Sequence, residues 1–354
     1  MTLSAGDPAP WFVVPTSQRP DYMFSTLAGR YVLLAFPGAG ASAGATEASL
    51  RAAARSGILN DDHVTAFMVL PGQPEGLPPP SCVGLRIGLD AGNFVATAYR
   101  ACSPASEMRE ATYTPHLLLL DPLLRVITPY GIDDLQKVLS TLTELPPPGR
   151  YQGAEAPAPV LLLPRVLEPE LCQALIDAYE AAGGSPSGFM EQEMERTVGT
   201  MDANRKRRSD YLMREPQLCQ ALRHRIEQRL VPEIHKAFQF RVSRIERYLV
   251  ACYDAADAGF FFQHRDNTTR LTAHRRFAVT INLNDNFIGG ALRFPEFSDR
   301  EYCPPAGGAV VFSCSLLHEA LPVTQGRRYA ALPFLHDRPA EAVRQANLST
   351  MPPA

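Results

Sequence analysis

The chain has 354 residues, of which 45% are hydrophobic and 20% are charged, a composition typical of a folded globular protein with about two domains. Its net charge of −3 excludes a general electrostatic attraction to nucleic acid or anionic membranes, and no apolar run approaches the ~20 residues of a membrane span. The seven cysteines have no CxxC or zinc-like spacing and the first residues lack a signal-peptide pattern, so we expect reduced thiols and a cytoplasmic location.

The first part of the chain alternates between strand and helix patterns. Apolar runs and helical periodicity predict strands at 31–36, 64–70, 116–120 and 124–128, and helices at 45–57, 92–100 and 132–143. This alternation is typical of an α/β fold. We therefore assign residues 1–148 to one α/β domain.

The second part of the chain begins after a stretch rich in Pro, Gly and Ala, which predicts a linker at 149–157. Helical spacing then predicts helices at 168–182 and 216–237, followed by short strands at 242–252, 259–264, 276–284, 290–294, 308–313, 317–323 and 328–335. Helices followed by many short strands are typical of a β-barrel or jelly roll that helices support. We assign residues 158–340 to this domain and 341–354 to a C-terminal tail.

The glycine-rich loop after the first strand, "FPGAGASAGATEAS", raises the question of nucleotide binding. A dinucleotide fold needs an acidic residue at the end of the next strand, where residues 70–72 are Leu-Pro-Gly. A P-loop needs Gly-Lys followed by Ser or Thr, where residues 44–46 are Gly-Ala-Thr. Neither requirement is met, so we exclude a nucleotide site at this loop.

The wider pattern of this domain resembles the peroxiredoxin branch of the thioredoxin fold. The resemblance covers residues 4–145 and rests on "AGDPAPWFVVPT", "LAGRYVLLAFPGAG" and "TYTPHLLLLDPLLRVI". In the last of these, Pro115 stands where thioredoxin folds keep a cis-proline before a strand, and Asp121 lies in the following turn. The resemblance therefore implies a thioredoxin-like domain for this half of the chain.

Peroxiredoxins carry a Thr and a peroxide-attacking Cys in the loop after the first strand. In this chain the Thr position is Ala41, and the Cys position is Gly44 or Ala45. The resemblance thus implies a scaffold without its nucleophile, which would serve packing, homodimerisation or partner binding. A thiol peroxidase or redox sensor that uses Cys82 or Cys102 stays open as a second hypothesis.

Three residues of the second domain have the spacing of a metal site. In "GFFFQHRDN", His264 and Asp266 are two residues apart, and side chains at i and i+2 point to the same face of a strand. A second histidine, His318, ends the apolar stretch "GGAVVFSCSLLH". Two His and one carboxylate form the facial triad of non-haem Fe(II) sites. The sequence therefore predicts a metal site at His264, Asp266 and His318.

Residues 158–337 resemble the prolyl 4-hydroxylase type of 2-oxoglutarate/Fe(II) dioxygenases through "PVLLLPRVLEPELCQALI", "ACY", "HRDN" and "GGALRFPE". The resemblance implies Fe(II) as the metal, 2-oxoglutarate as co-substrate and O2 as oxidant, with ascorbate as an optional reductant. By position, Arg328 would hold the far carboxylate of 2-oxoglutarate, and Tyr253 would lie against the co-substrate. Asn282 stands where the hypoxia-type enzymes have a tyrosine that contacts 2-oxoglutarate, and Thr280 shares its strand face.

The sequence thus predicts a multidomain protein, with an α/β thioredoxin-like (peroxiredoxin) domain before a double-stranded β-helix, or jelly roll, with supporting helices. The predicted activity is hydroxylation of a C–H bond in an amino-acid, peptide or protein substrate, coupled to decarboxylation of 2-oxoglutarate to succinate. The basic run Arg205–Arg208, with Arg275 and Arg276, would attract an acidic substrate, although a solvated loop is the simpler interpretation. A hydroxylase of secondary metabolites, and a scaffold protein with a vestigial metal site, stay open as alternatives.

Overall fold

The structure of the protein is a computed structural model that describes residues 3–72, 78–103, 112–193 and 196–349. The chain divides into two compact units, namely Met1–Pro157 with Pro295–Asp299 and Ala158–Phe294 with Arg300–Ala354. The sequence predicts residues 295–299 in the second domain, but this short segment belongs to the first unit. There Ser298 Oγ donates a hydrogen bond to the Ala156 carbonyl at 2.8 Å.

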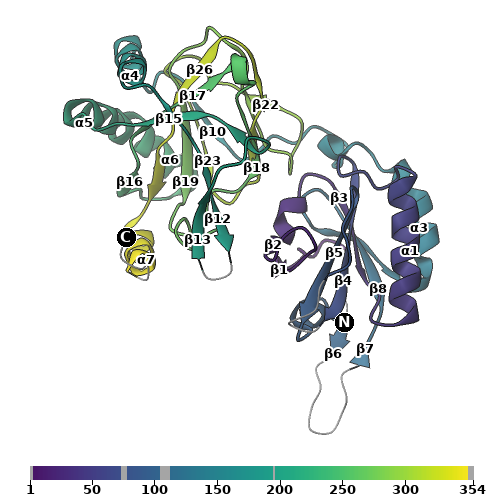
Figure 1. Ribbon diagram of the computed structural model, residues 1–354. Coiled ribbons are helices and arrows are strands. Elements are labelled where there is room, and N and C mark those ends of the chain that lie inside the picture. Colours follow the sequence, from purple (N-terminus) through teal and green to yellow (C-terminus); the bar gives the residue numbers. More distant parts are fainter. Residues whose placement is uncertain (1–2, 73–77, 104–111, 194–195, 350–354) are drawn as a thin grey trace. The chain divides into compact units, whose positions relative to one another are not determined.

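A five-stranded sheet forms the centre of the first unit (Figure 1). Its order is β5-β4-β3-β8-β9, in which β3, β4 and β5 are parallel and β8 and β9 pair in the antiparallel sense. The central strand β3 is buried along its whole length, as expected for a continuous apolar run with both faces covered. The strands of this unit are β1 (Val13–Val14), β2 (Tyr22–Met23), β3 (Tyr31–Phe36), β4 (Val64–Gly72), β5 (Leu85–Ala91), β6 (Cys102–Ser103), β7 (Thr112–Tyr113), β8 (His116–Leu120) and β9 (Val126–Gly131).

Helices α1 (Ala41–Arg55) and α3 (Leu135–Thr141) cover one face of this sheet. Aromatic side chains and the short helix α2 (Phe94–Ala98) lie on the other, where Tyr99 at the end of α2 meets Phe12. Leu50 of α1 and Val138 of α3 are buried in one core on the helical face. On the opposite face, Phe12 and Phe24 stack with ring centroids 4.5 Å apart, and both meet Phe67 edge-on.

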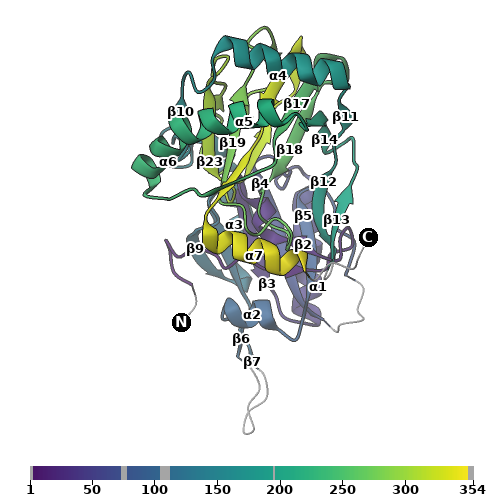
Figure 2. The same ribbon diagram turned by 90° about the vertical axis from the view of Figure 1, so that its left-hand side faces the viewer.

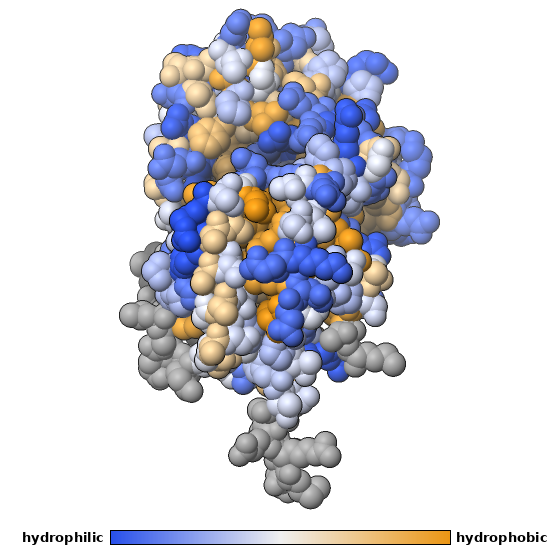
Figure 3. Space-filling view, turned by 90° about the vertical axis from the view of Figure 1, so that its right-hand side faces the viewer, coloured by the Kyte–Doolittle hydropathy of each residue, from blue (hydrophilic) through white to orange (hydrophobic). Residues whose placement is uncertain are grey.

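Helix α1 begins at Ala41, before the predicted start at residue 45. Gly40 causes this difference, because its φ of 71° closes the glycine loop directly ahead of the helix. The helix buries Thr46, Leu50 and Ala53 and exposes small residues between them. Figure 3 shows this side of the unit, where a narrow strip of weakly hydrophobic surface lies among hydrophilic side chains.

Pro115 precedes β8 as the sequence predicts, but the peptide bond before it is trans. The expected cis-proline is therefore wrong. Trans is the favoured form of an X-Pro bond. Asp121 lies in the turn between β8 and β9, as predicted.

The second unit is built on two antiparallel sheets packed face to face in a jelly-roll arrangement, with two further two-stranded sheets, β12-β13 and β20-β25. The larger has the order β10-β23-β19-β26-β17-β15-β11, with β16 and β27 beside it, and the smaller has the order β14-β18-β24-β21-β22. Phe312 of the larger sheet packs against His318 of the smaller, with ring centroids 4.5 Å apart. The strands of this unit are β10 (Leu161–Leu163), β11 (Ser185–Pro186), β12 (Phe189–Glu193), β13 (Arg196–Thr200), β14 (Lys206–Arg207), β15 (Ser209–Leu212), β16 (Arg244–Glu246), β17 (Leu249–Asp254), β18 (Phe260–His264), β19 (Phe277–Asn282), β20 (Ile288–Gly289), β21 (Leu292–Arg293), β22 (Glu301–Tyr302), β23 (Ala309–Ser313), β24 (His318–Ala320), β25 (Val323–Gln325), β26 (Arg327–Ala331) and β27 (Phe334–His336).

Three helices lie across the outer face of the larger sheet, as Figure 2 shows. They are α4 (Pro169–Ala182), α5 (Pro216–Arg225) and α6 (Val231–Phe238). On β19, Val279 and Ile281 enter the core beneath these helices. Because side chains alternate along a strand, Thr280 and Asn282 face the opposite way, toward the smaller sheet. The strands thus place apolar side chains outward and polar ones in the interior between the sheets.

The helix predicted over 216–237 is interrupted by a π turn at Ile226–Leu230. Pro232, in the first turn of α6, has no N–H to donate, and its ring would clash with an ordinary helical turn before it. The wider turn avoids this clash. No helix in the described parts of the chain is both long and apolar enough to cross a lipid bilayer.

The predicted tail from residue 341 is wrong, because α7 (Arg338–Leu348) occupies most of it. Asp337 caps this helix by accepting the Ala340 N–H at 3.0 Å. Glu341, in the first turn, accepts a hydrogen bond from His336 Nε2 of β27 at 2.7 Å. The helix is therefore attached to the larger sheet, while residues 350–354 lie outside the described residues.

We expect Glu341→Gln to loosen α7. Hydrogen bonds from Gln345 and then His336 lower the pKa of Glu341 to about 2, so the carboxylate stabilises the docked helix by about 1–2 kcal/mol at neutral pH. This contribution is present above the ordinary carboxyl pKa of 4.5 and is lost as the pH falls toward 2. Burial also lowers the pKa of His336, so protonation below its ordinary pKa of 6.5 destabilises the helix in the same direction.

Hydrogen–deuterium exchange of peptides covering residues 338–348 measures this effect. At pH 7 the variant should exchange about 5–30-fold faster than the wild type. Glu227→Gln, which breaks an exposed pair with Arg223, is the matched control and should change the exchange little. Equal exchange rates in Glu341→Gln and wild type would contradict the prediction.

Candidate metal centre

Three predicted metal ligands meet where two strands of the smaller sheet pair. β18 ends at His264 and β24 begins at His318, and the register places these two residues opposite each other. Asp266 follows directly, and its N–H donates to the Cys314 carbonyl at 2.9 Å. One ligand atom from each of His264, Asp266 and His318 lies within 4.8 Å of the others. The structure thus brings together the set that the sequence predicts.

Each histidine uses one ring nitrogen for the backbone and turns the other toward the carboxylate. Nδ1 of His264 is 2.7 Å from the Phe262 carbonyl, and Nδ1 of His318 is 3.0 Å from the Leu316 carbonyl. Their Nε2 atoms each lie 3.4 Å from an oxygen of Asp266. A ring that donates from Nδ1 keeps the lone pair of Nε2 free for a metal. Both imidazoles are therefore oriented as ligands.

The surroundings also favour the protonation states that a metal needs. Burial, with His264 as the next contribution, lowers the pKa of His318 to about 4. Burial by itself would raise the pKa of Asp266, but His318 and a hydrogen bond from His264 outweigh it, and the pKa lies well below its usual value. At neutral pH the site holds a carboxylate beside a neutral His318, the forms that bind a divalent cation. Two nitrogens and one carboxylate oxygen fit Fe(II).

On the larger sheet, three of the four predicted co-substrate residues contact one another. Arg328 and Tyr253 pair across β26 and β17, with the guanidinium 5.3 Å from the ring centroid. Arg328 Nε donates to Asn282 Oδ1 at 3.0 Å, and Asn282 Nδ2 donates to the Pro304 carbonyl at 2.7 Å. Thr280 is buried on the same face of β19, but the described part of the chain gives it no side-chain hydrogen bond to this group.

Arg328 is a buried cation, with 1% of its surface exposed. Within the described residues its hydrogen-bond acceptor is the neutral amide of Asn282, and no carboxylate lies within ion-pair distance. Burial lowers its pKa, yet a guanidinium keeps its charge at neutral pH. A buried charge without a counter-charge is costly, so this position favours an anionic ligand that a planar fork can bind.

The basic run 205–208 is not a fully solvated loop, which corrects that interpretation for two of its residues. Lys206 lies in β14 and Arg208 between β14 and β15, and both side chains are buried. Arg208 makes two 2.6 Å contacts with the Asp210 carboxylate and lies 3.4 Å from the Tyr253 hydroxyl. Lys206 and Arg208 are two residues apart, which is the spacing of side chains on one face of a strand. Because all four residues of the run are basic, the sequence does not show this alternation.

The other basic residues of the predicted patch are engaged locally. Arg205 pairs with Glu191, Arg275 pairs with Glu246, and Arg207 and Arg276 donate to the carbonyls of Ala203 and Ala273. The expected attraction of an acidic substrate by this surface therefore has little support. The basic side chains that are buried in the second unit near the candidate site are those of Lys206, Arg208 and Arg328.

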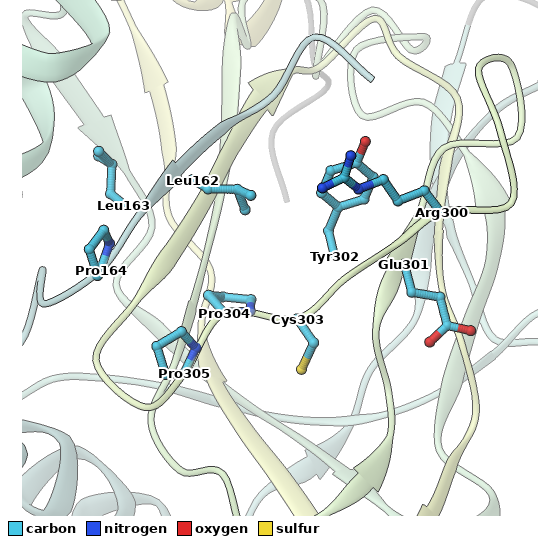
Figure 4. Close-up of a pocket in the computed structure, with 9 residues that line it drawn as sticks. All are labelled: Leu162, Leu163, Pro164, Arg300, Glu301, Tyr302, Cys303, Pro304 and Pro305. Carbon is cyan, nitrogen blue, oxygen red and sulfur yellow. The ribbon is translucent and has the colours of Figure 1, made fainter. Parts of the chain in front are cut away.

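A pocket of about 270 Å³ lies elsewhere in the second unit (Figure 4). It is lined by Leu162, Leu163, Pro164, Arg300, Glu301, Tyr302, Cys303, Pro304 and Pro305. None of the predicted metal or co-substrate residues lines it. Its connection to them is Cys303, whose sulfur lies 3.5 Å from Asn282 Nδ2. The metal centre is thus separate from this pocket.

The sequence is similar to curated hydroxylases over part of its length. PKHD-type hydroxylases from two Synechococcus strains, JA-2-3B'a(2-13) and JA-3-3Ab, are each 28% identical to it over 123 residues. The match covers 31% of this chain and 54% of each relative, so the chain spans about half the length of the curated relatives it matches. No protein-family model matches the chain.

Solved structures with a similar arrangement include two prolyl hydroxylases. A prolyl-4-hydroxylase from Pseudomonas putida is 20% identical, with 51% of this chain and 92% of that chain covered and a TM-score of 0.39. A prolyl hydroxylase from Trichoplax adhaerens, solved with a peptide fragment of hypoxia inducible factor, is 17% identical, with 62% and 96% covered and a TM-score of 0.41. Both TM-scores are below 0.5.

We expect the triad to bind one divalent cation and Asp266→Asn to weaken that binding at least about 100-fold, because the change removes the charged ligand. Calorimetric titration with Mn(II) under anaerobic conditions measures the affinity. Asp254→Asn is a matched control, since Asp254 pairs with Arg327 away from the triad, and should keep the wild-type affinity. If Asp266→Asn binds Mn(II) as tightly as the wild type, the triad is not the metal site.

Proposed function

We propose that the second unit is a 2-oxoglutarate- and Fe(II)-dependent dioxygenase that hydroxylates a C–H bond of an amino-acid, peptide or protein substrate. One observation carries the proposal: the triad of His264, Asp266 and His318 shares an interior with Arg328, a buried guanidinium without a carboxylate partner in the described chain. The partial match to PKHD-type hydroxylases supports the same class of reaction. The balanced reaction converts R–H, 2-oxoglutarate and O2 to R–OH, succinate and CO2.

The proposed metal ligands lie at the smaller sheet and the proposed 2-oxoglutarate-binding residues on the larger sheet. When bound at the triad, Fe(II) supplies the oxidation chemistry with O2 and 2-oxoglutarate. His264, Asp266 and His318 hold it from one side of the smaller sheet, which leaves the other coordination positions to ligands. Arg328, on the larger sheet, binds the far carboxylate of 2-oxoglutarate as a fork. Asn282 orients this guanidinium by accepting its Nε–H, and the Tyr253 ring packs against it.

A scaffold protein with a vestigial metal site would not explain why the triad is aligned. It would also not explain why Arg328 is buried without a carboxylate partner among the described residues. A hydroxylase of secondary metabolites uses the same centre, and only the substrate distinguishes it from the proposed enzyme. The metal centre and Arg328 support the reaction class in both cases.

We propose separately that the first unit is a peroxiredoxin-like scaffold without a nucleophile. The strand order, with three parallel and two antiparallel strands, supports a thioredoxin-like fold. Ala41, Gly44 and Ala45 occupy the first turns of α1, where a reactive thiol would have to stand. Burial and then Asp90 raise the pKa of Cys102, which disfavours a thiolate there. A homodimer through this unit and a cytoplasmic location stay predictions.

The dioxygenase proposal predicts formation of succinate from 2-oxoglutarate by the Fe(II)-loaded protein when O2 is admitted. His264→Ala should abolish it, and Arg328→Gln should raise the KM for 2-oxoglutarate about 100-fold, because a charged hydrogen-bond pair is lost. Arg327→Gln is the matched control: Arg327 is next in sequence but half exposed and paired with Asp254. Its KM should stay within about twofold of the wild type. Equal succinate formation by His264→Ala and wild type would refute the proposal.

The scaffold proposal predicts that the full chain consumes hydrogen peroxide no faster than its Cys82→Ser/Cys102→Ser double variant. Both proteins should be assayed after metal removal, because bound iron decomposes peroxide. Circular dichroism of both proteins controls for folding. A peroxidase activity that the double variant lacks would support the thiol-based alternative.

A further inference from the structure

Lys206 is a buried lysine that the roles proposed above do not use. Only 7% of its surface is exposed, in β14 at the edge of the smaller sheet. Its Nζ donates to Ser187 Oγ at 2.7 Å and to the Gly188 carbonyl at 2.5 Å. Among the residues that the structure describes, no carboxylate lies within ion-pair distance of this nitrogen. Two of the three N–H groups of the ammonium are engaged, and both acceptors are neutral.

This cation lies close to the metal centre. Lys206 and Phe261 pair across β14 and β18, and Nζ lies 4.8 Å from the centroid of the Phe261 ring. The same ring stacks on the imidazole of His264, with centroids 3.5 Å apart. A single aromatic ring therefore contacts both the Lys206 side chain and a predicted metal ligand.

The acidic groups nearby are already engaged. Asp210 accepts two hydrogen bonds from Arg208 and one from Ser187 Oγ, and Asp266 belongs to the triad. Burial, and after it the charge of Arg208, lowers the pKa of Lys206 to about 6, so the amine is largely neutral at pH 7 when no ligand is bound. A carboxylate bound at Nζ would stabilise the charged form and raise this pKa.

We propose that Lys206 binds a carboxylate of the substrate, so that the substrate is an acid whose carboxylate lies near the carbon to be hydroxylated. This inference rests on the proposed function and narrows its substrate class. Lys206 lies on the smaller sheet and Arg328 on the larger. Arg328 would take the carboxylate of 2-oxoglutarate, and Lys206 that of the substrate. Arg208, already paired with Asp210, is not a third binding group.

A structural role for Lys206 makes a different prediction. In that role its hydrogen bonds would hold Ser187 and Gly188 ahead of β12, and its charge would be irrelevant. Lys206→Gln keeps an N–H donor without the charge, and Lys206→Met removes both. Replacing an uncompensated buried charge by an apolar chain of similar size is often neutral or stabilising. The two variants therefore separate charge recognition from attachment of the loop.

The test uses the full chain loaded with Mn(II) and 2-oxoglutarate under anaerobic conditions. The probes are glutamate and aspartate capped as N-acetyl methylamides, with the equally capped glutamine and asparagine as uncharged controls. Paramagnetic relaxation of the probe side-chain protons by Mn(II) reports binding close to the metal. Arg207→Gln is the matched control variant, because Arg207 is the exposed neighbour of Lys206 on the same strand. Thermal unfolding shows that each variant is folded.

We expect the wild type to bind a capped acid at least about tenfold more tightly than its amide, and both Lys206 variants to lose that preference. Arg207→Gln should keep the preference, and the affinity of the Lys206 variants for 2-oxoglutarate should stay within about threefold.

Four results would overturn the inference. The wild type could bind acids no better than amides, or the Lys206 variants could keep the preference. The variants could instead lose 2-oxoglutarate together with the acids, which would assign Lys206 to the co-substrate. Lower thermal stability of the Lys206 variants with unchanged probe binding would show that Lys206 only holds the loop at Gly188 in place. Failure of the wild type to bind Mn(II) and 2-oxoglutarate would instead refute the proposed function itself.

Discussion

The candidate site depends on the antiparallel pairing of β18 with β24. That register sets His264 opposite His318, and the N–H of Asp266 bonded to Cys314 fixes the third ligand beside them. Residues far apart in the chain thereby meet within 4.8 Å. A shift of one residue in either strand would turn a histidine to the other face of the sheet, so the pairing determines whether a metal site exists at all.

Side chains of the larger sheet alternate between an outward face that forms the core and an inward face that carries candidate site residues. Its outward side chains, such as Val279 and Ile281 on β19, build the core beneath α4, α5 and α6. Its inward side chains include Asn282 and Arg328, which could not share an apolar core without large desolvation cost. The outer core thus stabilises strands whose inner face carries buried polar and charged groups. Most candidate site residues therefore lie on strands, and Asp266 lies in the turn just after β18.

Much of this arrangement could be predicted from the sequence, because it follows from local spacing. The HxD pair, the later His318 and the apolar periods of the strands are all short-range signals. What the sequence did not reveal depends on partners distant in the chain. The buried position of Lys206 requires Ser187 and the neighbouring strand β18, neither of which the basic run itself indicates. The same reason explains segment 295–299, which joins the first unit through Ala156.

The charged side chains of the interior bear on what the site can bind. Arg328, Arg208 and Lys206 are buried basic side chains. Of the nearby carboxylates, Asp210 pairs with Arg208 and Asp266 belongs to the triad. Asp210 neutralises Arg208, and Asp266 would partly neutralise a bound divalent cation. In the described part of the chain, no carboxylate lies within ion-pair distance of Arg328 or Lys206, which are on opposite sheets. A small diacid such as 2-oxoglutarate, held by the metal at one end, can bring its free carboxylate to only one of these cations. An interior with two such positions is therefore better suited to two acidic molecules than to one, and the second cation is the feature by which this site would select its substrate.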